Sequence, residues 1–332
     1  MNAPTRLGLY GLILVAVFAV AGVTANAVID EDTVQNWVEE EPEDHHGAEE
    51  GDGMNSVGHE DHGADASSLG LASAEDGYEL TEVAAPSEPG AEDELSLVVT
   101  GPDGSPVTDF DLDHEMEMHL IAVRADGQHF RHVHPERDDA GTWSIPWEWD
   151  EAGTYRVFAD FVPSAAGEGL TLSTTVQVAG DYDPTPASEP VTEATVDGFD
   201  VAVEGELIAG EASQLTMNIT RDGEPVTELQ PYLGAFGHLV ALRDGDLAYL
   251  HVHPHGDAPE AGETSGPEIV FDATAPTEGR YLLFLDFQVD GQVHTAPLVV
   301  DAAAGASNAS GVQSGNDSDT ASENEEDNDH DH

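Results

Sequence analysis

The sequence predicts an all-β protein made of two tandem antiparallel β-sandwiches, immunoglobulin-like or cupredoxin-like in architecture. Three observations lead to this prediction. Apolar and polar residues alternate in short runs, turn-forming Asp-Gly and Ala-Gly pairs separate the runs, and a stretch of about 100 residues recurs later in the chain. An N-terminal hydrophobic helix and disordered acidic tails complete the expected architecture.

The N-terminal segment, residues 1–29, contains the uncharged run Leu7–Val23 behind a single cation, Arg6. A cation before the run and acidic residues after it direct the rest of the chain out of the cell. A cleaved signal peptide fits this segment, with Ala25-Asn26-Ala27 as the cleavage site. An uncleaved anchor also fits and is favoured, because Leu7–Ile29 approaches the roughly 20 residues that span a bilayer. Either fate predicts a cell-surface protein, membrane-anchored or secreted.

Composition divides the remaining chain into five segments. Residues 30–91 are acidic and rich in Gly, Ser and Ala, so they are expected to form a disordered, histidine-containing stalk, and 303–332 form a similar tail. The proline-rich run 181–195 is the expected linker between domains. The predicted sandwiches are residues 92–180 and 196–302.

The two predicted sandwiches are copies of one another. The pattern H-L-x-x-x-R…H-V-H-P begins at His119 and again at His238 with the same internal spacing. Downstream, GTYRVFADF (153–161) corresponds to GRYLLFLDF (279–287). Such internal repetition indicates one structural unit used twice. Within each copy the apolar residues recur with period two, as in Trp143-Ser-Ile-Pro-Trp147, which predicts strands with one buried and one exposed face.

Three histidines of each copy are expected on one face of a β-hairpin. In the first copy, a turn at Asp126-Gly127 pairs His119 with His134 and Ile121 with His132. A register slipped by two residues would pair His119 with His132, and the three rings would still share a face. Imidazoles on directly opposed residues, with Cβ atoms about 5 Å apart, can converge on one ion at about 2.0–2.1 Å. The predicted metal ligands are therefore His119, His132, His134, His238, His251 and His253.

A structural role for these histidines stays open beside the metal site. The imidazoles could instead donate hydrogen bonds to loop carbonyls, with Pro135 and Pro254 ending the strands. Asp160 and Asp286, which occupy equivalent positions in the two copies, could orient a liganding imidazole, although exposed-face positions are favoured for them.

A second, methionine-containing site is conceivable in the first copy. His114, Met116 and Met118 alternate along the sequence and would lie on the face opposite His119. Thioethers favour Cu(I), but a partly buried strand that happens to contain methionine is the favoured interpretation.

Composition excludes several classes of function. The chain carries 8 Lys+Arg against 68 Asp+Glu, a formal charge of −60, so it has no basic face for nucleic acid. At molar salt the Debye length is about 3 Å, so repulsion between the acidic side chains is largely screened. A surface this acidic therefore suits a protein that works in concentrated salt. The absence of cysteine excludes thiolate metal sites and disulfides. Catalytic sequence motifs are also missing, which predicts a protein that is not an enzyme.

The paired motif over residues 92–302 resembles secreted or membrane-anchored bacterial and archaeal proteins with tandem immunoglobulin-like domains, loosely similar to the YtkA-like type. That resemblance implies an extracytoplasmic β-sandwich protein associated with copper or heavy-metal handling. The predicted function is accordingly binding of copper or zinc ions at the cell surface, with the membrane contacted through the N-terminal helix and no protein partner identified. The alternative is a non-catalytic adhesion or structural protein whose histidines are structural.

Overall fold

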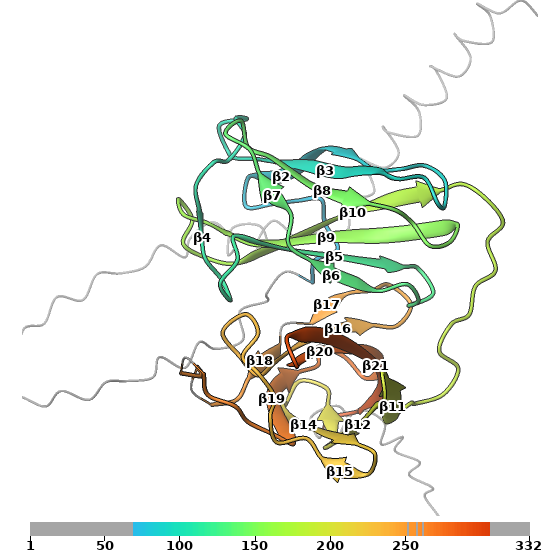
Figure 1. The fold of residues 1–332 in the computed structure, drawn as a ribbon. Helices are drawn as coiled ribbons and strands as arrows, with labels where there is room; N and C mark the ends of the chain where they lie inside the picture. The colour runs from blue at the N-terminus through green and yellow to red at the C-terminus, as the bar shows by residue number, and fades with distance from the viewer. Residues whose placement is uncertain (1–68, 251, 257, 261, 306–332) are drawn as a thin grey trace, which may run out of the picture. The chain divides into compact units, whose positions relative to one another are not determined.

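The computed structural model describes residues 69–250, 252–256, 258–260 and 262–305, and this part of the chain folds into β-strands without a helix (Figure 1). The predicted all-β class is confirmed for these residues. Within them, no helix is long and apolar enough to cross a membrane. The predicted N-terminal helix, residues 30–68 of the stalk and residues 306–332 of the tail lie outside the described residues.

The first repeat forms two antiparallel sheets. One sheet has the order β1-β2-β3-β8-β7, formed by Ala74–Glu75, Tyr78–Ala84, Asp93–Thr100, Thr142–Trp147 and Glu136–Arg137. The other has the order β10-β9-β5-β6, formed by Leu170–Val178, Gly153–Pro163, Met118–Arg124 and Arg131–Val133, with β4 (Phe110–Asp111) paired to β9. Their facing sides enclose the first core, which contains Leu97, Leu120, Trp143, Val157 and Phe161.

The second repeat has the same strand order with small additions. One sheet is β11-β12-β14-β19-β18, formed by Glu193–Val196, Phe199–Glu204, Ala212–Arg221, Glu268–Thr274 and Val252–Pro254, with β15 (Glu224–Pro225) paired to β14. The other is β13-β21-β20-β16-β17, formed by Leu207–Ile208, Gln292–Ala303, Gly279–Val289, Gly237–Arg243 and Tyr249–Leu250. The order β9-β5-β6 thus recurs as β20-β16-β17, so the repetition read from the sequence extends to the topology.

The first sandwich starts earlier than the sequence predicts. Strands β1 and β2 lie within residues 30–91, where a disordered stalk is expected, and β2 pairs with β3. In β2, Tyr78 and Leu80 are buried while Glu79 between them is exposed. The acidic composition that suggests disorder therefore belongs to the outer face of a strand.

Strands at the centre of the fold are buried on both faces, which corrects the expected pattern of one buried and one exposed face. Every residue of β5 is buried. Leu120 points into the first core, whereas Ile121 belongs to a separate apolar cluster together with Phe284 of the second repeat. In this third cluster the ring of Phe130 stacks on that of Phe284, with centroids 3.9 Å apart and planes at 3°.

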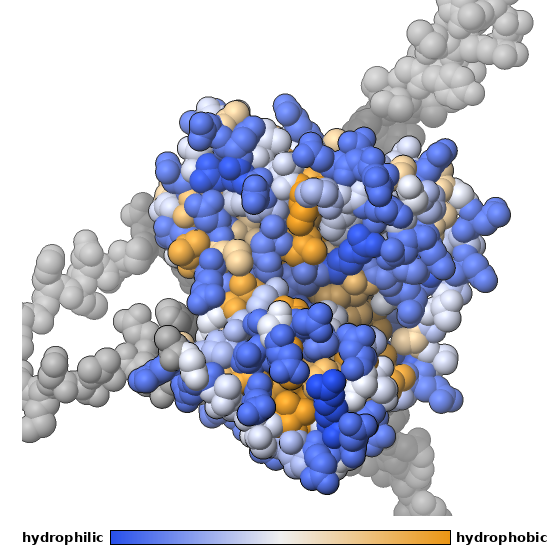
Figure 2. Space-filling view, in the orientation of Figure 1, coloured by the Kyte–Doolittle hydropathy of each residue, from blue (hydrophilic) through white to orange (hydrophobic). Residues whose placement is uncertain are grey.

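The third cluster joins the two repeats through the outer faces of β5, β9, β16 and β20. Its buried members are Ile121, Val123, Phe158, Val240, Leu242, Leu247, Tyr249, Leu282, Phe284 and Val299. The face of the molecule seen in Figure 2 is by contrast mostly hydrophilic, with apolar residues in small patches. Apolar side chains that would be exposed if the two sandwiches were separate are therefore buried between the repeats.

Candidate metal centre

The β5–β6 hairpin determines where the three histidines of the first copy lie. Its register pairs Ile121 with His132, as the sequence predicts for a two-residue turn. Gly127 in that turn has a φ of 81°, a backbone conformation that glycine adopts without steric cost. His119 on β5, His132 on β6 and His134 just beyond β6 consequently project to the same side.

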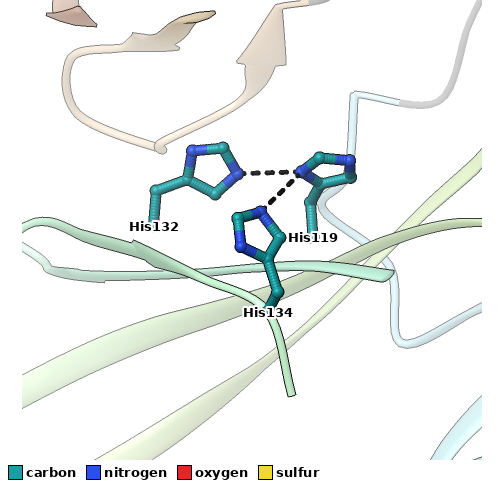
Figure 3. A group of neighbouring side chains, drawn as sticks. All are labelled: His119, His132 and His134. Atoms are coloured by element: carbon teal, nitrogen blue, oxygen red, sulfur yellow. Dashed lines mark hydrogen bonds between the residues drawn. The ribbon is translucent and has the colours of Figure 1, made fainter. Parts of the chain in front are cut away.

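The three imidazole rings converge, as Figure 3 shows. Nδ1 of His119 lies 3.0 Å from Nε2 of His132 and 3.2 Å from Nε2 of His134. The three ring nitrogens all fall within 4.8 Å of one another. Ligand nitrogens at 2.0–2.1 Å from a tetrahedral zinc ion would be about 3.3 Å apart. The geometry therefore fits three imidazoles around a single ion after small adjustments.

Contacts on the far side of two rings fix which nitrogen carries the proton. Nε2 of His119 lies 3.1 Å from the backbone oxygen of Asp113, and Nδ1 of His132 lies 2.8 Å from Oδ2 of Asp286. Carbonyl and carboxylate oxygens accept hydrogen bonds, so each of these nitrogens must donate one. In the neutral rings, Nδ1 of His119 and Nε2 of His132 are therefore unprotonated.

These two unprotonated nitrogens point at each other across 3.0 Å. Neither can donate to the other. A neutral His134 can donate its Nε2–H to Nδ1 of His119 at 3.2 Å, but Nε2 of His132 then has no donor within the triad. A metal ion would satisfy these two nitrogens and Nε2 of His134 together.

Burial keeps two of the rings neutral. Desolvation lowers the pKa of His119 to about 4, and repulsion from His132 adds to the shift. Desolvation also lowers the pKa of His134 to about 3, with His132 and His119 contributing. Metal ions bind the neutral imidazole, so at neutral pH protons compete little for these two ligands.

The second predicted triad is arranged differently. Nε2 of His238 donates to the backbone oxygens of Tyr232 and Leu233, at 3.1 and 3.0 Å. His253 is exposed on β18, which belongs to the opposite sheet from β16. His251 lies outside the described residues. Within the described residues, the histidines of the second copy do not form a three-ligand group, so a metal site there stays a prediction.

Histidines of both copies nevertheless surround one cavity of about 70 Å³. Its lining includes His114, His119, His132, His238 and His253. The water-accessible space suffices for ordered water, which needs about 10–15 Å³. Both halves of the repeat therefore contribute side chains to the surroundings of the convergent triad.

The predicted methionine site is not formed. Asp113 and Met116 exchange two backbone hydrogen bonds of 2.9 Å, and His114 between them has a positive φ of 45°, so this segment is a tight turn and not the expected alternating strand. Met118 packs in the first core. The ring of His114 instead lies 4.8 Å from that of His238, on the side of the molecule where His119 is found.

Asp286 is buried, which differs from the position that the sequence favours for it. An exposed-face position is favoured for it from the sequence, but it is 2% exposed and bonded to His132. The available signal was its position within an otherwise apolar strand, Leu282–Phe287, where alternation is absent.

Both sandwiches match one family of known sequences. The family described as a domain of unknown function, DUF8832, matches residues 72–180 and 194–304, which correspond to the two sandwiches. No curated protein matches the chain in sequence.

Similar solved structures include a bacterial integrin-binding protein, a putative membrane anchored protein and a bacterial adhesin. Invasin, a bacterial integrin-binding protein, is 15% identical with a TM-score of 0.20, covering 69% of this chain and 39% of its own. A putative membrane anchored protein from Corynebacterium diphtheriae is 10% identical with a TM-score of 0.21, covering 69% and 59%. The adhesin InvE of Yersinia pseudotuberculosis is 14% identical with a TM-score of 0.21, covering 68% and 58%. This chain spans less than two thirds of each of these three chains.

Proposed function

The chain belongs to the DUF8832 family, and we propose that it is an extracytoplasmic metal-binding protein whose first sandwich holds a divalent transition-metal ion through His119, His132 and His134. The observation that carries the proposal is the pair of unprotonated nitrogens facing each other at 3.0 Å. An extracytoplasmic location is supported by the hydrophobic N-terminal run of the sequence.

Copper(II) is the favoured ion, with zinc second. Three neutral imidazoles suit both ions, and at a given nitrogen site the Irving–Williams order places copper above zinc. Methionine gives copper no further support at this site, because Met118 belongs to the first core. The preference therefore rests on affinity order alone.

Binding, rather than catalysis, fits the groups around the triad. Three protein ligands leave a fourth position for water or for a ligand from a partner, which suits a protein that stores an ion and passes it on. A metallohydrolase would also need a general base beside the metal-bound water. Asp286, the carboxylate bonded to the triad, is held by His132 and by the hydroxyl of Thr295, which leaves it unsuited to that task.

Calorimetric titration of the full chain with Cu(II) and Zn(II) in molar salt tests the proposal. We expect tight binding by the wild-type protein. His134→Gln should weaken it by more than 10–100-fold, the range for loss of a group that only hydrogen-bonds a metal ligand. His134 is partly exposed, so this change should leave the fold intact. The matched control is the double variant His330→Gln/His332→Gln, which removes histidines from the acidic tail and should leave the tight site unchanged.

Cobalt(II) provides an independent readout of coordination. The wild-type protein loaded with Co(II) should give the visible absorption of a four-coordinate site, and His134→Gln should lose it. Equal affinity in wild type and His134→Gln, or binding that disappears with the tail histidines, would favour the adhesion alternative with structural histidines.

A further inference from the structure

The carboxylate that orients His132 comes from the other repeat. His132 lies on β6 of the first sandwich and Asp286 on β20 of the second, and their side chains are 4% and 3% exposed. Oδ2 of Asp286 accepts the Nδ1–H of His132 at 2.8 Å, while Oδ1 accepts the hydroxyl of Thr295 on β21. One carboxylate oxygen is therefore fixed within the second sandwich and the other faces the first.

Each repeat carries the same aspartate–threonine pair, yet His132 uses the pair of the other repeat. On β9 of the first copy, Asp160 lies opposite His119 and accepts the hydroxyl of Thr171 at 2.9 Å. On β20, Asp286 lies opposite His238 in the same way. The ring of His132 thus depends on a group that reaches it only when the two sandwiches are docked.

The surroundings of this contact make it sensitive to docking. The third apolar cluster joins the outer faces of the same sheets, and both partners of the His132–Asp286 bond are almost fully buried. A buried hydrogen bond to a carboxylate is stronger than one in water, and leaving either partner alone there is costly. Separation of the sandwiches would break this bond and expose the ring of His132. The proton of the neutral ring would then no longer be held on Nδ1.

We propose that Asp286 is a positioning residue for the metal centre, and that ion binding and docking of the two sandwiches are coupled. The bound ion stabilises the docked state, and docking raises the affinity for the ion by the same factor, as linkage requires. This inference rests on the proposed function, since it concerns the same three ligands. The class of ligand is unchanged, a divalent transition-metal ion.

The first test is Asp286→Asn in the full chain, titrated with Zn(II) and Cu(II). The affinity should fall 10–100-fold, the range for loss of a carboxylate partner of a liganding histidine. The matched control is Asp197→Asn, which removes the same charge from the second sandwich. It also breaks a comparable bond, 2.8 Å from Oδ2 to Nδ1 of His294, and should leave metal affinity unchanged.

Thr295→Val provides a milder variant should Asp286→Asn fail to fold. It removes only the hydroxyl that holds Oδ1 of Asp286, so the affinity should fall in the same direction by a smaller factor. If His134→Gln abolishes binding while Asp286→Asn and Thr295→Val bind as wild type, the inference is wrong and the proposed function stands. Absence of binding in the wild-type protein overturns both.

The coupling itself can be measured by energy transfer. The chain has no cysteine, so Ser105→Cys and Glu224→Cys, at exposed positions in the two sandwiches, can be labelled with a donor and an acceptor. In urea that partly undocks the sandwiches, Zn(II) should raise the transfer efficiency of the otherwise wild-type protein and have less effect with Asp286→Asn. Transfer that does not respond to Zn(II), or responds equally in both, would overturn the coupling.

Discussion

Truncation of Phe284 should undock the two sandwiches without unfolding either one. Its ring is 4% exposed, belongs to the third apolar cluster and stacks on Phe130 at 3.9 Å. Phe→Ala in a core costs about 3–5 kcal/mol. Phe284 also borders a surface cavity of about 680 Å³, which admits water to the space left behind and places the cost near the lower end.

A loss of about 3 kcal/mol corresponds to a docking constant lowered on the order of 100-fold, at 1.4 kcal/mol for each factor of ten. The labelled Ser105→Cys/Glu224→Cys protein should therefore lose energy transfer at lower urea with Phe284→Ala, while the main unfolding transition keeps its midpoint. Phe287→Ala on the same strand is the matched comparison, because Phe287 lies in the second core and its loss should lower the main transition. The assignment of Phe284 to docking and not to the second core would be refuted in either of two cases. Loss of energy transfer at an unchanged urea concentration is one, and a lower urea midpoint of the main unfolding transition is the other.

Two further predictions concern acid sensitivity and the first sandwich. Burial lowers the pKa of His119 and of His238 to about 4, below the usual 6.5, so the unfolded chain takes up protons first as the pH falls. The free energy of unfolding of the metal-free protein should be highest above pH 6.5 and should fall as the pH is lowered from 6.5 to 4. Urea unfolding in molar salt measures this. A urea midpoint that stays constant or increases as the pH is lowered would contradict the assignment of buried neutral rings. Asp126→Asn should cost about 3–5 kcal/mol, since Asp126 and Arg124 form a pair in which both side chains are 2% exposed. Asp246→Asn, its more exposed counterpart beside Arg243, should cost about 0–1 kcal/mol, and similar losses for the two variants would argue against the buried pair.

The convergent triad of the first copy could be predicted because its causes are local. The Asp126-Gly127 turn sets the register, and strand alternation then places His119 and His132 on one side. The second core and its sheet could be inferred in the same way, because the repeat carries the same alternation and turn signals.

The features that the sequence did not reveal depend on long-range packing or on special backbone geometry. Asp286 reaches His132 across 154 residues, and only the docking of two sheet faces brings them together. The positive φ of His114 belongs to a tight turn, which no alternation pattern distinguishes from a strand. Strand β2 was hidden because its exposed glutamates resemble the acidic stalk.

The most direct test is the anomalous diffraction of crystals grown with Zn(II) or Cu(II) in high salt. We predict a metal peak about 2.0–2.1 Å from Nδ1 of His119, Nε2 of His132 and Nε2 of His134, with His132 still bonded to Asp286. Density without a peak at this point, and with the two facing nitrogens still 3.0 Å apart, would contradict a metal ion held by the three histidines.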